Sequence, residues 1–398
     1  MKKRIELLAP AGNLEKLKIA ILYGADAVYI GGKSFSLRAR ANNFSLDDIK
    51  EACIFAKEHN ACIYVTMNII PHDCDLDGLE QYLLYLQEVG VKAIITSSMH
   101  IIKTCLRVSP QLEVHLSTQL SSTNSLSCEF YKSLGVKRVV LGRETSLKEM
   151  ALIKKHTDIP LEAFIHGGMC SSYSGRCMLS NHMVNRDANR GGCAHSCRWN
   201  YDLYNNDIKL NKDSYFHIGS KDLCAIKAIK EMMDIGIDSL KIEGRMKSDY
   251  YIATVVRTYR QLIDDIVCGN EINYDYYFNE ISKAENRASS TGFLFNEPSV
   301  EEQLYDRDER PTKEFVGIVK SYDKASKLCI LEQRNYFTIG DKLEFFGPNL
   351  KNTIYEVKEI RDTDLNILDA ARHPKQLIVL NVDFEVSCND MIRLVINK

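Results

Sequence analysis

The sequence lacks any long apolar segment that would place it in a membrane. No hydrophobic run among its 398 residues approaches the length that crosses a bilayer. The first residues, Met-Lys-Lys-Arg, are basic, but no apolar stretch of signal-peptide length follows them. We therefore expect a protein with no membrane partner and no secretion signal.

Three common catalytic motifs and a strong net charge are also missing. The chain contains no G-x-G-x-x-G, no G-x-S-x-G and no H-E-x-x-H. No motif therefore supports a nicotinamide-dependent dehydrogenase, a serine hydrolase or a zinc protease of those types. The 51 Lys and Arg residues nearly balance the 53 Asp and Glu residues, so that the net charge is -2. Any nucleic-acid binding must use a local basic face, because the whole protein is not a polycation.

Cysteine, in contrast, is frequent. The chain has 13 cysteines, and most of them are scattered through apolar segments. An odd number of scattered cysteines argues against a disulfide framework and indicates a reducing compartment. We therefore expect a cytoplasmic protein.

A repeated alternation of strand and helix patterns fills about the first 250 residues, which is typical of parallel α/β folds. Eight such units predict a (β/α)8 TIM-like barrel, with a doubly wound open sheet as the alternative. The predicted strands are Ile5–Ala9, Ala27–Gly31, Cys62–Met67, Ala93–Thr96, Glu113–Leu116, Arg138–Leu141, Leu161–His166 and Ser239–Glu243. The predicted helices include Leu14–Tyr23, Leu46–His59, Leu76–Val89, Ser121–Leu134, Leu147–His156, Tyr250–Val267 and Tyr274–Ala288.

The spacing of the last two barrel strands predicts a long insertion. Because 72 residues separate the seventh strand from the eighth, we expect an insertion at about 167–237, on the carboxyl-terminal rim where TIM barrels carry their active sites. The catalytic barrel should occupy 1–296, followed by a charged linker over 297–311. Strand patterns with a period of two then predict a small antiparallel β-barrel over 312–398. Such a domain is a common RNA- or partner-binding accessory, but it can also be a structural cap.

Four cysteines form a group at the start of this insertion. They follow the pattern C-x6-C-x15-C-x3-C and are Cys170, Cys177, Cys193 and Cys197. Thiols without an interleaved pair of histidines favour an iron–sulfur cluster or zinc, and coincidental grouping is the third alternative. The segment from Cys170 to Asn200, which we call the cysteine segment, also contains four arginines against one acid, Asp187. Because this positive charge would stabilise an anionic cluster and hold an anionic substrate, we expect an iron–sulfur centre.

Polar side chains lie near the ends of several other predicted strands. In a barrel these strand ends converge on one rim, which makes the side chains candidates for an active site. Each one alone can equally be a solvated charge or part of a rim salt bridge. The candidates are Asn68, His115, Gln119, Arg143, Lys241, Glu243 and Arg245, together with Arg190 and Arg198 beside the cysteines.

Two further residues lie close to the group of four cysteines along the chain. His166 ends the seventh predicted strand, and it is either a catalytic residue at the rim or a structural partner of the cysteine segment. Cys224 is expected to begin a helix as a buried core residue, with service as a substitute ligand as the alternative.

Long stretches of the chain resemble a known family. The segment from Glu162 to Cys177, E-A-F-I-H-G-G-M-C-S-S-Y-S-G-R-C, closely resembles the signature of the collagenase-like peptidases, peptidase family U32. The resemblance covers nearly the whole chain. Further matching segments are Leu8–Gly12, Asn189–Trp199, Ser220–Leu223, Ser239–Lys247 and the terminal domain entered at Glu314.

Within this family, the architecture and the cysteine spacing look like those of the tRNA 5-hydroxyuridine modification proteins. The resemblance implies hydroxylation of the wobble uridine of tRNA at C5, with a [4Fe-4S] cluster and with prephenate as co-substrate. A paralogous subunit or a second copy of the chain is a further expected partner. The alternatives are hydroxylation of a cytidine in 23S rRNA, a peptidase activity, and a non-catalytic, metal-stabilised RNA-binding scaffold.

For this reaction the residues suggest three sets of roles. The four cysteines would bind the cluster, and arginine forks would suit the two carboxylates of prephenate. Proton transfer and other catalytic roles fall to Glu162, His166, Lys241 and Glu243. Substrate binding falls to Arg143, Arg190, Arg198, Arg245, Asn68, His115 and Gln119.

Overall fold

The computed structural model describes residues 5–36, 43–210, 215–284, 287–303 and 314–395. Part of the predicted linker, residues 304–311, lies outside the described residues. Within the described ranges, no helix combines the length and the hydrophobicity that a membrane crossing requires.

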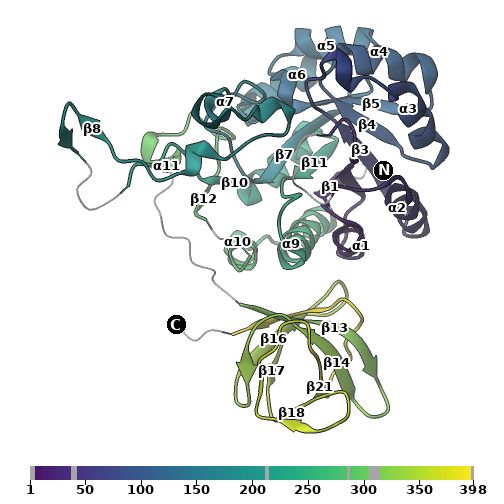
Figure 1. Ribbon diagram of the computed structural model, residues 1–398, viewed down its shortest axis with the longest axis vertical. Coiled ribbons are helices and arrows are strands. Elements are labelled where there is room, and N and C mark those ends of the chain that lie inside the picture. Colours follow the sequence, from purple (N-terminus) through teal and green to yellow (C-terminus); the bar gives the residue numbers. More distant parts are fainter. Residues whose placement is uncertain (1–4, 37–42, 211–214, 285–286, 304–313, 396–398) are drawn as a thin grey trace.

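Eight parallel strands form a closed barrel in the first part of the chain (Figure 1). The sheet closes because the last strand pairs with both the first and the seventh. The strands are β1 (Glu6–Pro10), β2 (Ala27–Gly31), β3 (Cys62–Met67), β4 (Ala93–Thr96), β5 (Glu113–Leu116), β6 (Arg138–Val140), β7 (Leu161–Gly167) and β11 (Ser239–Ile242). The predicted TIM-like barrel is confirmed, and the open-sheet alternative is wrong.

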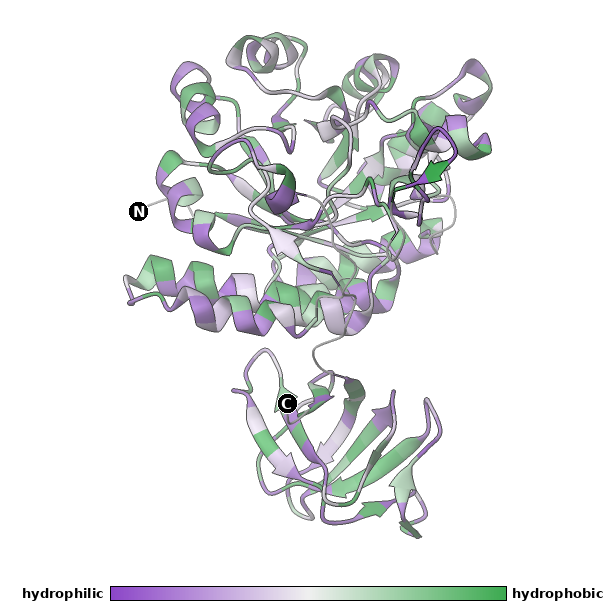
Figure 2. Cartoon of the chain, turned by 90° about the vertical axis from the view of Figure 1, so that its left-hand side faces the viewer, coloured by the Kyte–Doolittle hydropathy of each residue, from purple (hydrophilic) through white to green (hydrophobic). Residues whose placement is uncertain are grey.

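Helices surround this barrel and cover its outer face. Most of the buried apolar side chains lie in one continuous core, and Figure 2 shows hydrophobic and hydrophilic residues alternating along these helices. The helices are α1 (Leu14–Leu22), α2 (Leu46–Glu58), α3 (Leu79–Glu88), α4 (Met99–Val108), α5 (Ser125–Ser133), α6 (Leu147–His156), α8 (Ile229–Ile235) and α9 (Asp249–Cys268).

Two predicted helices are shorter than expected. The helix predicted from Ser121 begins at Ser125, because Ser121 has a left-handed backbone and Asn124 caps the first turn. The helix predicted to run to residue 288 is α10 (Tyr274–Ser282). Both differences arise at helix ends, where a single turn residue can stop the helix.

The segment between β7 and β11 carries short elements, and one of them extends the sheet beside β7. The strand β10 (Asp222–Cys224) pairs antiparallel with β7, and β12 (Ser289–Ser290) pairs with β10. The prediction that Cys224 begins a helix is therefore wrong, although its side chain is buried as expected. The other elements are α7 (Leu179–Val184), β8 (Tyr204–Asn205) and β9 (Ile208–Lys209).

The last part of the chain folds as an antiparallel half-barrel, as predicted. Its sheet order is β17-β16-β22-β13-β14-β21-β18-β19, and β17 and β19 are the two ends. These strands are β13 (Phe315–Asp323), β14 (Leu328–Gln333), β16 (Lys342–Phe346), β17 (Thr353–Glu356), β18 (Ile360–Arg361), β19 (Ile367–Leu368), β21 (Leu377–Asn381) and β22 (Met391–Leu394). A separate pair joins β15 (Phe337–Thr338) to β20 (Ala370–Ala371).

The half-barrel packs against α9 and α10 of the TIM-like barrel (Figure 1). At the centre of this contact is Arg393, which is fully buried and donates from Nη2 to Glu280 at 2.9 Å and from Nε to Glu344. Tyr250 of α9 stacks on Phe315 with a ring separation of 5.1 Å. Burial raises the pKa of Glu280, but Arg393 and Lys283 outweigh this effect and lower the pKa to about 2. The two parts of the protein are therefore joined by a buried charge cluster and not only by the chain.

We predict that this contact weakens in acid. A carboxylate with a depressed pKa stabilises the folded state above its ordinary pKa, and this stabilisation is lost as the pH falls through about 4.5 to about 2. At pH 7, Glu280→Gln should lower the free energy of unfolding by about 3 kcal/mol. Urea unfolding at pH 7 and pH 3 should show this difference shrinking in acid. The control Glu356→Gln, on an exposed residue of β17, should change the free energy of unfolding by less than about 0.5 kcal/mol. If the stability difference between the wild type and Glu280→Gln grew in acid, the role of Glu280 would be contradicted.

Candidate active site

The four cysteines gather just beyond the end of β7. Cys170 and Cys193 are exposed, and Cys177 and Cys197 are half-buried. Desolvation by nearby protein atoms raises the pKa of the Cys170 thiol; Arg143 opposes the rise, while Cys193, Cys197 and Cys177 add to it. The four thiols are therefore close enough to affect one another electrostatically. Among the described residues, no three His, Cys, Asp or Glu side chains are arranged so as to hold a metal ion.

The first half of the cysteine segment is attached to the loops after β5 and β6. The amide of Ser174 donates to Glu144 at 2.9 Å, and the hydroxyl of Ser121 donates to the carbonyl of Ser174 at 2.6 Å. Gly175 has a positive φ of 75°, and a Cβ atom there would lie 2.2 Å from the carbonyl oxygen of Gln119. Only glycine tolerates both conditions. Gln119 therefore touches the cysteine segment through its backbone.

The second half of the segment is attached to the loop after β3. Arg190 forms a two-pronged ion pair with Asp75, at 2.7 and 3.2 Å, and donates to the carbonyl of Ile70 at 2.7 Å. The hydrogen bond from Arg190 lowers the pKa of Asp75. Arg190, which the sequence suggested as a substrate-binding residue, therefore already has a carboxylate partner within the protein.

Arg198 occupies the space between the cysteines and β10. Its Nη2 donates to the carbonyl of Met169 at 3.2 Å and to Asp222 at 3.3 Å. Its Nη1 is buried and has no hydrogen-bond partner among the residues that the structure describes. A buried donor of this kind is costly to leave unpaired, so the guanidinium has capacity for an anionic group.

A small cavity of about 140 Å³ lies beside the first cysteine. Arg143, Glu144 and Cys170 are among the residues that line it, together with Met169 and Phe293. The guanidinium carbon of Arg143 lies 3.8 Å from the centre of the Phe164 ring, which holds this cation at the rim. The cavity thus places a positive charge and a thiol next to the same small volume.

Glu243 lies next to Gly168, close to the start of the cysteine segment. The amide of Gly168 donates to its carboxylate at 3.4 Å, and the hydroxyl of Tyr251 donates to its carbonyl at 3.1 Å. Gly167 has a φ of 104° and approaches the backbone of Glu243 so closely that a side chain could not fit. The end of β11 and the start of the cysteine segment are therefore packed directly together.

The interior of the barrel holds a network of charges that includes Lys241, which the sequence placed at the rim. Glu162 is fully buried and accepts from Lys241 at 2.6 Å and from Arg138 at 3.2 Å. Arg138 also donates to Glu6 at 2.6 Å, and the hydroxyl of Tyr64 donates to the same carboxylate at 2.6 Å. Burial pushes the pKa of Glu162 up, but Lys241 and Arg138 outweigh it and hold the pKa below its usual value. The carboxylate of Glu162 is therefore charged and fully engaged.

His166 and His115 are both enclosed by protein. His166 packs against the rings of Tyr251 and Tyr259 in α9, and burial and then Lys247 lower its pKa to about 3 against the opposing effect of Glu243. The sequence placed His115 at the rim, but the structure buries it inside the barrel, where it contacts Glu113 at 3.2 Å. That placement was wrong because every second side chain of a barrel strand points inward.

Arg245 and Asn68 lie at the rim, and the side chain of Arg245 reaches toward β2 and β3. Arg245 is buried and donates to the hydroxyls of Ser36 and Thr66 at 3.1 Å and to Asn43 at 2.8 Å. Asn68 directly follows β3 and is partly exposed. The catalytic and binding roles of all these residues stay predictions.

Sequence reasoning assigned no acidic residue to holding the site together. Glu144, Asp75 and Asp222 each bind a group of the cysteine segment, although they come from three separate loops or strands. The surplus of arginine between the first and last cysteines was a signal that such partners must exist. Only the folded arrangement identifies them, because ion pairs between distant residues leave no local pattern.

We predict that Glu162→Gln destabilises the barrel by about 3 kcal/mol or more, because it leaves the buried Lys241 without a counter-charge. Urea unfolding of the purified variant measures this loss. The control Glu51→Gln removes an exposed partner of Lys18 and should cost less than about 1 kcal/mol. Equal stabilities for the two variants would show that the interior network contributes little.

Comparison with known proteins identifies the family. Residues 12–304 match peptidase family U32, and residues 311–393 match the peptidase family U32 C-terminal domain. The "tRNA hydroxylation protein P1" of Bacillus subtilis is 48% identical over 401 residues, which cover 98% of this chain and 95% of that protein. A 23S rRNA 5-hydroxycytidine synthase of Escherichia coli is 38% identical over 264 residues, 66% of this chain and 40% of that protein. The "Collagenase" of Porphyromonas gingivalis is 30% identical over 375 residues, 89% of this chain and 90% of that protein. The chain therefore belongs to peptidase family U32.

Proposed function

We propose that this protein hydroxylates the wobble uridine of tRNA at C5, with prephenate as co-substrate and a [4Fe-4S] cluster as cofactor. The observation that carries this proposal is the relative named "tRNA hydroxylation protein P1", which matches 98% of the chain at 48% identity. The rim geometry supports it, because four thiols, a small cavity and two arginines lie together there. Such a role belongs in the cytoplasm.

The number and the type of the donors fit the proposed cluster, and the thiols would have to draw together around it, because the described side chains are not arranged around a metal position. Cys170, Cys177, Cys193 and Cys197 come from one segment, act on one another electrostatically and supply the four thiolates that a [4Fe-4S] cluster requires. When bound, the cluster supplies redox capacity for hydroxylating an unactivated ring carbon, which side chains lack. The proposed contribution of Arg143 is to offset the negative charge of the thiolates from the side of the cavity.

Two arginines are the best candidates for binding the dicarboxylate. Arg190 is paired with Asp75, and Arg245 binds hydroxyls and an amide at another part of the rim. Arg143 lines the cavity beside Cys170, and Arg198 has a buried nitrogen without a hydrogen-bond partner among the described residues. A guanidinium fork matches a carboxylate in geometry as well as in charge. Prephenate would therefore be gripped between Arg143 and Arg198.

Glu243 is the best-placed candidate for proton transfer. Its carboxylate is partly exposed at the rim and accepts a hydrogen bond from Gly168, two residues before the first cysteine. Glu162, in contrast, is enclosed between Lys241 and Arg138 inside the barrel, where no RNA base can reach it. We assign Glu162 and Lys241 to holding the barrel and Glu243 to the chemistry.

The half-barrel is proposed to position the RNA. Small antiparallel barrels commonly serve as RNA-binding accessories. The buried contact at Arg393 would keep this module in a fixed relation to the rim, so that a bound tRNA presents one loop to the cysteine segment. The wobble base would have to leave its stack to reach the cavity.

The test is nucleoside mass spectrometry of tRNA from a strain that lacks this chain and any paralogue. Nucleosides derived from 5-hydroxyuridine should disappear and return with the wild-type copy. A copy with Arg198→Lys should restore these nucleosides to about one tenth of the wild-type level or less. Lys keeps the positive charge but lacks the planar fork of the guanidinium. Arg176→Lys, on an exposed residue of the same segment, should restore the wild-type level.

Normal levels of these nucleosides in the deletion strain would defeat the proposal. Loss of a hydroxylated cytidine from 23S rRNA instead would favour the ribosomal alternative, which the 38% identical relative suggests. If the purified protein cleaved collagen, and if all the cysteine variants cleaved it too, a peptidase activity would be favoured.

A further inference from the structure

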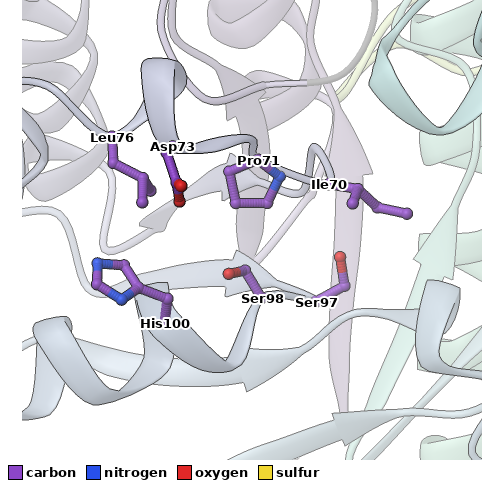
Figure 3. Close-up of a pocket in the computed structure, with 7 residues that line it drawn as sticks. All are labelled: Ile70, Pro71, Asp73, Leu76, Ser97, Ser98 and His100. Atoms are coloured by element: carbon purple, nitrogen blue, oxygen red, sulfur yellow. The ribbon is translucent and has the colours of Figure 1, made fainter.

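A second cavity lies away from the thiols, between the loops that follow β3 and β4. Its volume is about 300 Å³, and one wall carries Ile70, Pro71, Asp73 and Leu76. The facing wall carries Ser97, Ser98 and His100, and Figure 3 shows the two rows opposite each other. Both loops begin at the carboxyl ends of parallel strands, so this cavity opens on the same rim as the cysteines.

The cysteine segment holds the first wall in place. The amide of Ile70 donates to the carbonyl of Asn189 at 3.2 Å, and Arg190 donates to the carbonyl of Ile70 at 2.7 Å. Arg190 also pairs with Asp75, which belongs to the same short turn as Asp73. The residues between the second and third cysteines therefore shape this cavity directly, and the cavity and the cysteines form one continuous rim.

The second wall contains an unused hydrogen-bonding group. Ser98 caps α4, because its hydroxyl accepts from the amide of Ile101 at 3.4 Å. The hydroxyl of Ser97 is buried and has no hydrogen-bond partner within the described ranges. Since a buried hydroxyl that stays unpaired costs free energy, a ligand that pairs with Ser97 gains this free energy on binding.

The chemistry of the walls selects the kind of ligand. Ile70, Pro71 and Leu76 offer an apolar surface that suits the face of a flat ring, and the volume is at the lower end of the range for small-molecule sites. Asp73 accepts hydrogen bonds only, so it suits a ligand that presents hydroxyl donors. The same carboxylate disfavours a phosphate or a dicarboxylate next to it, and His100 on the facing wall can form a hydrogen bond with a neutral ligand. A ring attached to a sugar with free hydroxyls meets all these conditions.

We propose that this cavity binds one ribonucleoside of the RNA substrate, with Asp73 pairing with the ribose hydroxyls and Ser97 pairing with another polar atom of the same nucleoside. The inference rests on the proposed function and deepens it by naming a site that distinguishes RNA from DNA. The 2′-hydroxyl is the group that makes this distinction, and the phosphates on either side stay outside the cavity. The apolar residues of the first wall cover the base without selecting its identity.

Binding of uridine and of 2′-deoxyuridine to the full chain, measured by calorimetric titration, tests this proposal. Uridine should bind the wild-type protein about tenfold more tightly than 2′-deoxyuridine. Asp73→Asn should weaken uridine binding about tenfold and remove most of the preference for the ribonucleoside. Ser97→Ala should weaken it about threefold. A short oligouridylate RNA should displace bound uridine, whereas the matching DNA should not.

The matched control is Asp77→Asn, which removes an exposed carboxylate from the same loop without touching the cavity. It should bind uridine like the wild type. Equal affinity for uridine and 2′-deoxyuridine, an unchanged affinity in Asp73→Asn, or an equal loss in Asp77→Asn would each overturn the proposal. If RNA failed to displace uridine, the role in RNA binding would be overturned. This experiment measures binding without turnover, so its result is independent of the nucleoside analysis. The nucleoside site can be overturned while the nucleosides in the cell still support tRNA hydroxylation, and tRNA hydroxylation can be overturned while uridine still binds.

Discussion

One buried carboxylate organises the barrel on which the site depends. Glu162 of β7 lies between Lys241 of β11 and Arg138 of β6, and Arg138 reaches across the interior to Glu6 of β1. Removing one partner from a buried ion pair leaves an uncompensated charge and destabilises the fold. The network therefore favours the arrangement of strands in which all these partners meet. β7 ends three residues before Cys170. The network that fixes β7 therefore also fixes where the cysteine segment begins.

The cysteine segment itself has little regular structure, and other parts of the rim hold it. Acidic residues from separate loops bind it at intervals: Glu144 binds Ser174, Asp75 binds Arg190 and Asp222 binds Arg198. Much of the positive charge of the segment is thus used in building the rim. Arg143 lines the cavity beside Cys170, and one nitrogen of Arg198 is buried without a hydrogen-bond partner among the described residues.

The barrel could be predicted because its signals are local. Each strand is a short apolar run, and most of the longer helices begin after a residue such as Ser146, whose side chain caps the first turn. Errors arose where distant residues decide the structure. Cys224 lies in a strand because it pairs with His166, and His115 is enclosed because the sheet closes around it. The cavity lined by Asp73 and Ser97 left no pattern in the sequence, since its two walls come from separate loops.

The proposed function depends on an iron–sulfur cluster bound by the four thiols at this rim. The most direct measurement is metal and acid-labile sulfide analysis of protein purified without oxygen, together with its visible absorption spectrum. The account predicts about four irons and four sulfides per chain and a broad band near roughly 400 nm. Substituting alanine for any one of Cys170, Cys177, Cys193 or Cys197 should remove them, whereas Cys224→Ala should not. One zinc per chain with no iron or sulfide would contradict the account.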